Sequence, residues 1–307
     1  MFLGKVVVVT KKTALEELVE RFCSRAQAAF YLEHAGLSFA DYEAAHDAYH
    51  ASLEQLLERE VPREIKHQVI ERSFLPSFRF GQKDVVVTLG PDGLVVNAAK
   101  YLEEQPIVGV NPDPARVDGV LCRFPVRGVG QVIRETTQDK RSVRAVSMAR
   151  ATLRDGQTLD AFNDLFVGVS SHGSARYAIE VGGKEERQSS SGIVIATGAG
   201  STGWMSSILN GSFAVARAFG ASPEGSQERR WEDPRLVFAV REPFVSRTSA
   251  AALVYGTLEE GEFMKIESRT PEGGVIFSDG VEKDFLAFNS GAVATIGIAP
   301  RKAHLVA

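Results

Sequence analysis

Three short apolar runs constrain the fold of this 307-residue chain more than any other feature of its sequence. They lie at residues 5–10, 84–89 and 106–111, and each is rich in valine or isoleucine. Continuous runs of β-branched residues are typical of strands that are buried on both faces of a parallel sheet. The sequence therefore predicts a parallel sheet that helices must cover.

Helices are expected between these strands. Residues 14–60 are rich in Ala, Leu and Glu and carry apolar residues at three- and four-residue spacing, which predicts amphipathic helices. The charged mixture in residues 54–72 is interpreted as a solvated helix surface. A further helix is expected over residues 94–102, directly after a turn. Residues 1–141 are thus predicted to form an α/β domain, a parallel sheet with helices.

Residues 142–307 have a different texture. Short alternating segments, punctuated by Gly, Ser and Pro, predict a mostly β C-terminal domain. Residues 221–233 have the composition of a loop and are expected to be the most mobile segment of this domain. The expected strands are residues 143–153, 165–169, 175–181, 192–197, 235–240 and 263–268.

Composition excludes several classes of protein. A net charge of −4 argues against sequence-independent binding to nucleic acid, which needs a concentrated basic face. No apolar run approaches the roughly 18–20 residues of a membrane helix. Cys23 and Cys122 are too few for a disulfide framework and are expected to be reduced thiols. Because the first strand begins almost at once, no signal peptide is expected, and a cytoplasmic location is predicted.

The first motif is the turn Gly90-Pro91-Asp92-Gly93, which follows the strand at residues 84–89 and precedes a helix. A turn of this kind lies at the carboxyl edge of a parallel sheet and directs backbone N–H groups and a helix N-terminus at bound phosphate. Asp92 would be exposed there. The alternative is that Asp92 only shapes the turn or caps the helix.

The second motif is a loop of small residues after the strand at residues 192–197. Glycines in such a loop let a ligand approach the backbone closely, although flexible turns often have the same composition. Its candidate binding residues are Thr197, Gly200, Ser201, Thr202, Gly203 and Trp204.

The third motif is the pair Asn163-Asp164 at the start of a strand. An amide and a carboxylate can hydrogen-bond the base edge and the ribose hydroxyls of a nucleoside. The alternative is an Asx turn that opens the strand.

In this order and at this separation, the three motifs resemble those of the NAD kinase family, which are a GGDG turn, an Asn–acidic pair and a GSTAY-type loop. The resemblance is closest to the mitochondrial branch of the family and covers almost the whole chain. It includes residues 106–114, 121–126, 163–168, 190–192, 239–243 and 278–280.

The resemblance implies phosphorylation of the 2′-hydroxyl of the adenosine ribose of NAD or NADH, with ATP or another donor and Mg²⁺. It places NAD in a cleft between the two domains, with Asp92 beside the reacting hydroxyl as general base. Asn163 and Asp164 would hold adenine and ribose. Gly90 and Gly93 of the turn, the residues of the second motif and Asp279 would complete the ligand-binding set. A homodimer is also implied. From the composition, no nucleic-acid or membrane partner is expected.

The chain departs from the family pattern in the turn. Pro91 replaces the second glycine and has no N–H to offer a phosphate, and Leu94 replaces the usual Thr or Ser. The aromatic residue of the loop is Trp204, with Gly203 before it. Two other functions remain open, a lipid or small-molecule kinase of the same superfamily and a non-catalytic NAD(P)-binding sensor.

His46 and His50 stand four residues apart in a predicted helix, a spacing that can bind a metal ion on one helix face. No third ligand at matching spacing is visible in the sequence. The two imidazoles are therefore interpreted as part of a solvated helix face, and no metal ligand is predicted.

Overall fold

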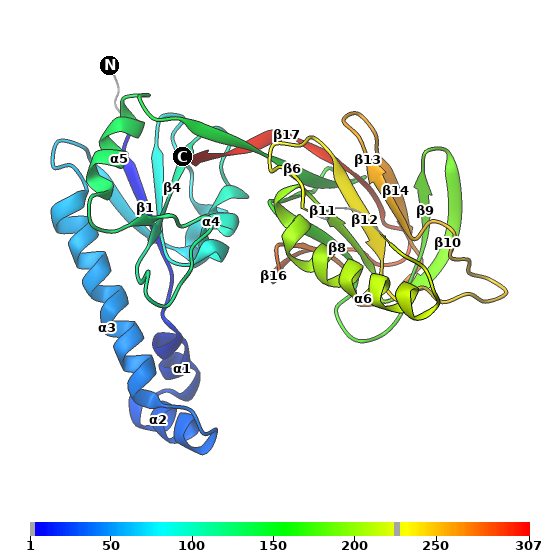
Figure 1. Cartoon of the computed structure of the whole chain (residues 1–307), viewed down its shortest axis with the longest axis horizontal. Helices are drawn as coiled ribbons and strands as arrows, with labels where there is room; N and C mark the ends of the chain where they lie inside the picture. The colour runs from blue at the N-terminus through cyan, green and yellow to red at the C-terminus, as the bar shows by residue number, and fades with distance from the viewer. Residues whose placement is uncertain (1–3, 224–227) are drawn as a thin grey trace. The chain divides into compact units, whose positions relative to one another are not determined.

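The computed structural model describes residues 4–223 and 228–307, which form two compact units (Figure 1). The first unit extends to Arg144 and also contains His304–Ala307, and the second is Ala145–Ala303. The first combines a sheet with helices, and the second is built mainly of sheets. The predicted fold class, an α/β N-terminal part followed by a mostly β part, is confirmed.

A parallel sheet forms the centre of the first unit, in the order β4-β3-β1-β2. The last residues of the chain, His304 and Leu305, add a parallel pairing on β4. The three predicted strands are confirmed, but β2 lies where a helix surface was expected. Its side chains are mostly exposed because it is an edge strand, so it lacks an apolar run. The strands are β1 (Val6–Thr10), β2 (His67–Glu71), β3 (Val85–Leu89) and β4 (Pro106–Asn111).

Helices bury both faces of this sheet. On one face, α3, η1 and α5 pack over an aliphatic core that includes Val8, Val87 and Val110. Val7 and Val86 alternate to the opposite face and are equally buried, where α4 packs against β3 and β4. Helices α1 and α2 pack against each other and against α3 (Figure 1). The helical elements, with the short strand β5 (Phe124–Pro125), are α1 (Ala14–Phe22), α2 (Arg25–His34), α3 (Phe39–Gln55), η1 (Leu56–Glu60), η2 (Arg72–Ser77), α4 (Asp92–Ala99) and α5 (Val129–Thr137).

Two sheets face each other in the second unit. One has the order β10-β9-β14-β17, with β6 paired to β17 and β7 paired to β6. The other has the order β13-β12-β11-β8-β15-β16 and is antiparallel. The core between them includes Tyr177, Phe238 and Ile266. The strands are β6 (Val143–Leu153), β7 (Thr158–Ala161), β8 (Asp164–Val169), β9 (Ala175–Val181), β10 (Lys184–Ser190), β11 (Ile193–Ala196), β12 (Leu236–Val240), β13 (Tyr255–Leu258), β14 (Met264–Ser268), β15 (Gly274–Ser278), β16 (Val281–Ala287) and β17 (Val293–Val306).

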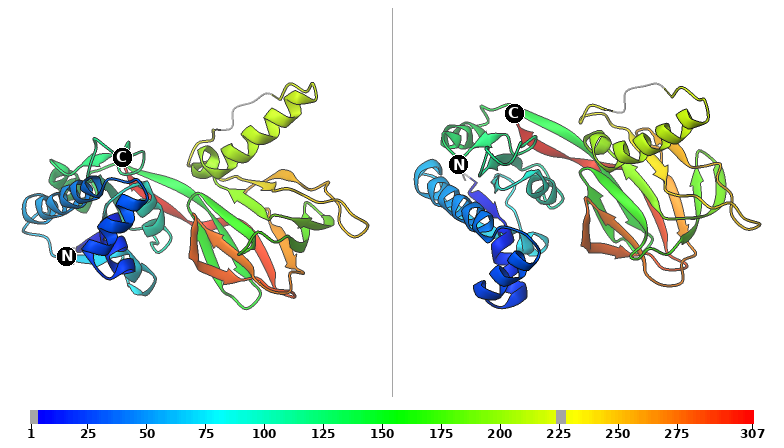
Figure 2. Two further views of the ribbon diagram at one scale, coloured as in Figure 1. Left: turned by 90° about the horizontal axis from the view of Figure 1, so that it is seen from below. Right: turned by 60° about the horizontal axis from the view of Figure 1, so that its bottom comes forward.

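One long helix of the second unit was not predicted. Helix α6 (Trp204–Ala218) follows the short helical turn η3 (Ala199–Thr202). It begins on the outer face of the second sheet and projects away from the sheet toward its C-terminal end (Figure 2). Its Trp204 and Met205 pack on Phe166 and Phe277, which alternate away from the core between the sheets. The expected helix at residues 94–102 begins earlier, at Asp92.

Among the described residues, no helix is both long and apolar enough to cross a membrane. Of the predicted loop at residues 221–233, residues 224–227 lie outside the described part of the chain. The rest of that segment contains no helix or strand.

Candidate functional site

The turn after β3 is held at the carboxyl edge of the parallel sheet by hydrogen bonds from neighbouring elements. The N–H of Gly90 donates to the carbonyl oxygen of Val110 at 3.1 Å. The hydroxyl of Tyr49, from α3, donates to the carbonyl oxygen of Leu89 at 3.2 Å and accepts the N–H of Lys11 at 3.1 Å. The turn is therefore fixed on both sides, to β4 and to α3.

Asp92 is the first residue of α4, and its carboxylate binds the backbone of a loop that follows β4. Its Oδ1 accepts the N–H groups of Leu121 at 2.8 Å and Cys122 at 2.9 Å, and its Oδ2 accepts that of Val120 at 3.0 Å. The N-cap position belongs to Pro91, and no side chain caps the helix there. The interpretation of Asp92 as a helix cap is therefore wrong, because its carboxylate is used to hold a second segment.

These bonds determine the charge of Asp92. Burial raises the pKa of its carboxyl, but the N–H groups of Cys122 and Leu121, the thiol of Cys122 and the N–H of Val120 outweigh burial, so the pKa lies below its ordinary value. Burial and the neighbouring Asp92 raise the pKa of the Cys122 thiol to about 12. Asp92 is thus ionised, and Cys122 remains a thiol, at neutral pH.

The departures from the family turn fit the local packing. Pro91 has a φ of −71°, which its ring imposes in any case. Leu94 is buried, and a Cβ added to Gly90 would lie 3.0 Å from its Cδ2. A Cβ added to Gly93 would meet nothing within 4 Å, so space alone does not require a glycine there.

In the second unit, the carboxylate of Asp279 also accepts backbone N–H groups, here from the residues at the start of β8. Its Oδ1 accepts the N–H of Asn163 at 2.7 Å and of Asp164 at 3.3 Å, and its Oδ2 accepts the N–H of Phe162 at 3.0 Å. Its own N–H donates to the carbonyl oxygen of Asp164 at 3.0 Å. Asp279 adopts a φ of +55°, which is uncommon for a residue other than glycine and marks a locally constrained turn.

Asp164 is buried beside this carboxylate, and its own carboxylate accepts no hydrogen bond from the described residues. Burial, and then the charge of Asp279, raise the pKa of Asp164 to about 7. Asp164 is therefore poised to gain or lose a proton near neutral pH.

The small-residue loop packs directly on the Asn163 backbone. The N–H of Thr197 donates to the carbonyl oxygen of Asn163 at 2.9 Å, and its hydroxyl donates to that of Phe162 at 2.6 Å. The N–H of Gly200 donates to the Thr197 hydroxyl at 3.2 Å. A Cβ on Gly200 would lie 2.1 Å from the Asn163 carbonyl oxygen, so only glycine permits this approach.

Trp204 lies at the other end of the same loop, where α6 begins. Its ring stacks on Phe166, with centroids 5.5 Å apart, and the guanidinium of Arg241 lies 5.3 Å from its centroid. The three side chains help to line a cavity of about 630 Å³, within the range of small-molecule pockets. Asn163, Asp164 and Asp279 are not among the residues that line it.

The structure thus brings together five predicted residues of the second unit through hydrogen bonds, namely Asn163, Asp164, Thr197, Gly200 and Asp279. The Ser201 hydroxyl donates to the Gly198 carbonyl oxygen at 2.7 Å and accepts the N–H of Arg229 at 3.1 Å. Thr202 and Gly203 complete the turn that leads into α6. Gly90, Asp92 and Gly93 belong to the first unit.

Sequence reasoning missed the backbone N–H groups of residues 120–122. Backbone donors carry no residue signature, so no sequence signal marks them. Arg241 was visible as a cation near a family-like segment, but its ring contact depends on packing.

We predict that Gly200→Ala lowers the free energy of unfolding by about 3 kcal/mol or more, because its Cβ would overlap the Asn163 carbonyl. Gly211→Ala is the matched control in α6, where an added Cβ meets nothing within 4 Å. That control should gain up to about 1 kcal/mol, since alanine is the better helix former. Urea denaturation measures both, and equal effects would contradict the close approach.

Asp164 should make stability depend on pH. Since its pKa is about 7 in the fold and near 4 when unfolded, the folded state holds an extra proton between these values. The free energy of unfolding should therefore fall as pH rises from about 4 to 7. Asp164→Asn should stabilise the protein by about 2 kcal/mol at pH 8 and change it little at pH 4.

Glu180→Gln, at an exposed ion pair with Lys265, is the control and should follow the wild-type pH dependence. Thermal melts at both pH values provide the measurement. A stability difference between Asp164→Asn and wild type that is the same at pH 4 and pH 8 would rule out a raised pKa.

Comparison with known proteins supports the resemblance seen in the motifs. No protein-family model matches the chain. It is 23% identical to human mitochondrial NAD kinase 2 over an alignment that covers 96% of this chain and 82% of that protein. Yeast NADH kinase complexed with NADH superposes with a TM-score of 0.58 at 16% identity, covering 100% of this chain and 84% of that one. An Archaeoglobus fulgidus NAD kinase in complex with ATP gives a TM-score of 0.56 at 17% identity, covering 98% and 93%. The chain has the fold of the NAD kinases.

Proposed function

We propose that this protein is an NAD kinase, which transfers a phosphoryl group to the 2′-hydroxyl of the adenosine ribose of NAD or NADH. One observation carries the proposal. Hydrogen bonds unite Asn163, Thr197 and Asp279 into one group, although Asn163 and Asp279 are 116 residues apart in the sequence. These three residues stand at positions that match the NAD kinase motifs. The human NAD kinase aligns with 96% of this chain.

Both substrates are supported by the solved relatives, one of which was crystallised with NADH and another with ATP. In this chain, Asn163 and Asp164 would hold adenine and ribose, and Thr197 with the Gly200–Trp204 loop would line the dinucleotide site. The turn at Gly90 and Gly93 would face phosphate. Mg²⁺ is expected to accompany the triphosphate and neutralise its charge during transfer.

The chemistry requires mainly alignment. Phosphoryl transfer passes through a loose transition state, so positioning and charge neutralisation contribute more than proton abstraction. Asp92 is ionised and held rigidly by three N–H groups, and it is proposed to orient the ribose hydroxyl and accept its proton. Its lowered pKa keeps it unprotonated across the neutral range, at the cost of weak basicity.

A homodimer and a cytoplasmic location remain part of the proposal. The human relative is named as mitochondrial, so location needs its own measurement. The rival function with the most structural support is an NAD(P)-binding sensor, because Pro91 removes one N–H from the turn that would face phosphate.

The decisive experiment combines purified protein with ATP, Mg²⁺ and either NAD or NADH, and detects NADP(H) with an NADP-specific dehydrogenase. We expect product with at least one acceptor. Dinucleotide binding by calorimetry without product under any donor would support the sensor. Turnover of a lipid in place of NAD would support the lipid kinase.

Asp92→Asn should reduce turnover by about 10²-fold or more, because an amide cannot accept the ribose proton. It should also lower the free energy of unfolding by about 1–3 kcal/mol, since the amide nitrogen cannot accept a backbone N–H. Asp118→Asn is the control, because that carboxylate lies in the same loop region and accepts none of these bonds. Dinucleotide affinity should stay within a small factor.

The pH dependence of kcat/KM tests the protonation state of Asp92. Because its backbone donors hold the pKa of Asp92 below the ordinary value of an aspartate, its protonation should not reduce kcat/KM above about pH 5. An Asp92→Asn variant that turns over at nearly the wild-type rate would remove this residue from the mechanism.

A further inference from the structure

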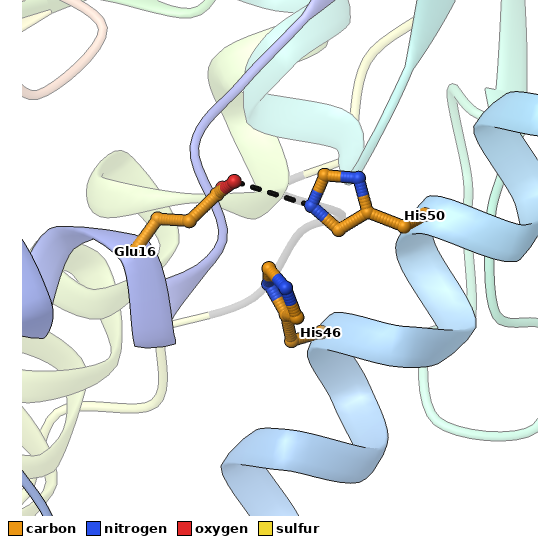
Figure 3. Close-up of side chains that lie close together, drawn as sticks. All are labelled: Glu16, His46 and His50. Carbon is orange, nitrogen blue, oxygen red and sulfur yellow. Dashed lines mark hydrogen bonds and ion pairs between the residues drawn. The ribbon is translucent and has the colours of Figure 1, made fainter. Parts of the chain in front are cut away.

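Glu16 of α1 meets His46 and His50 of α3 on the surface of the first unit. His46 and His50 lie one turn apart, and the Glu16 carboxylate faces them from the neighbouring helix (Figure 3). One potential ligand atom of each residue lies within 4.8 Å of those of the other two. The Oε1 of Glu16 is 3.1 Å from the Nε2 of His50. The third ligand absent from the sequence pattern is thus supplied by another helix.

The spacing suits a small transition-metal ion. Zinc binds imidazole nitrogen and carboxylate oxygen at about 2.0–2.2 Å, so two ligands of a tetrahedral ion lie about 3.3–3.6 Å apart. The Glu16–His50 pair is already close to that separation. The other ligand atoms lie within 4.8 Å of one another. The side chain of His50 is 44% exposed, so its imidazole can rotate to shorten these distances, and water can fill the remaining coordination position.

Neighbouring groups hold the ligands in place. The hydroxyl of Thr13 hydrogen-bonds the Nδ1 of His46 at 2.9 Å, which is the type of contact that orients metal-binding histidines. The Oε2 of Glu16 accepts the N–H of Thr13 at 2.7 Å, which leaves Oε1 for the ion. Thr13 and Glu16 form the capping box of α1, so the geometry of the carboxylate is fixed by the start of the helix.

We propose that Glu16, His46 and His50 bind one divalent zinc ion, which joins α1 to α3. Two imidazoles and one carboxylate select zinc over Mg²⁺ and Ca²⁺, which prefer all-oxygen sites. The site shares no residue with the predicted kinase site and does not depend on the proposed function.

The test uses the tag-free full chain, stripped of metal with a chelator and titrated with Zn²⁺ by calorimetry. We expect one Zn²⁺ per chain and a higher thermal midpoint, because the ion binds the folded state. Excess Mg²⁺ should not displace it. His46→Gln and His50→Gln should each weaken Zn²⁺ binding by about tenfold or more, since even outer contacts to such ligands are worth that much.

Glu16→Gln keeps an acceptor for the capping box while weakening the metal site, so it tests binding without unfolding α1. His67→Gln is the control, because this exposed histidine lies on β2. Cys23→Ser tests the exposed thiol as a competing ligand. Absence of Zn²⁺ binding, binding that survives both histidine substitutions, or binding lost only in Cys23→Ser would each overturn the proposal.

Discussion

Two aspartate carboxylates each hold three consecutive backbone N–H groups, and the shape of both candidate sites depends on these contacts. Asp92 binds residues 120–122, and Asp279 binds residues 162–164. Hydrogen bonds to an ionised acceptor are stronger than those between neutral groups, and a carboxylate has enough lone pairs for all three. Each aspartate therefore supplies hydrogen-bond acceptors to backbone N–H groups that regular secondary structure does not satisfy at these places.

The same contacts give the carboxyl groups of Asp92 and Asp164 different pKa values. Asp92 is stabilised as an anion by its donors, and its pKa is lowered. Asp164 is buried, receives no such donor from the described residues and lies next to the charge of Asp279, so its pKa is raised to about 7. Asp92, which is proposed to accept the ribose proton, would therefore act mainly through its fixed position and its negative charge. Asp164 instead changes its charge near neutral pH.

Secondary structure was predicted from the sequence most accurately where the elements are buried. The β1, β3 and β4 strands were predicted because both of their faces are covered, which demands continuous apolar residues. The β2 edge strand has no such demand, and its sequence His-Gln-Val-Ile-Glu resembles a helix surface. Helix α6 was missed because it starts directly from a loop of small residues, with no side-chain cap to mark its beginning. The motif residues were visible in the sequence, but the hydrogen bonds that Asp92 accepts were not, since they come from backbone N–H groups.

Tertiary packing also explains why the spacing of His46 and His50 could not reveal Glu16 as the third member of the cluster. The segment Thr13–Glu16 predicts a helix start, and His46 and His50 predict one helix face, but their meeting depends on how α1 packs against α3. Between the two histidines lies Tyr49, whose hydroxyl bonds the carbonyl of Leu89, the residue just before the Gly90 turn. The helix that carries the two histidines therefore also holds the turn after β3, through the Tyr49 hydroxyl.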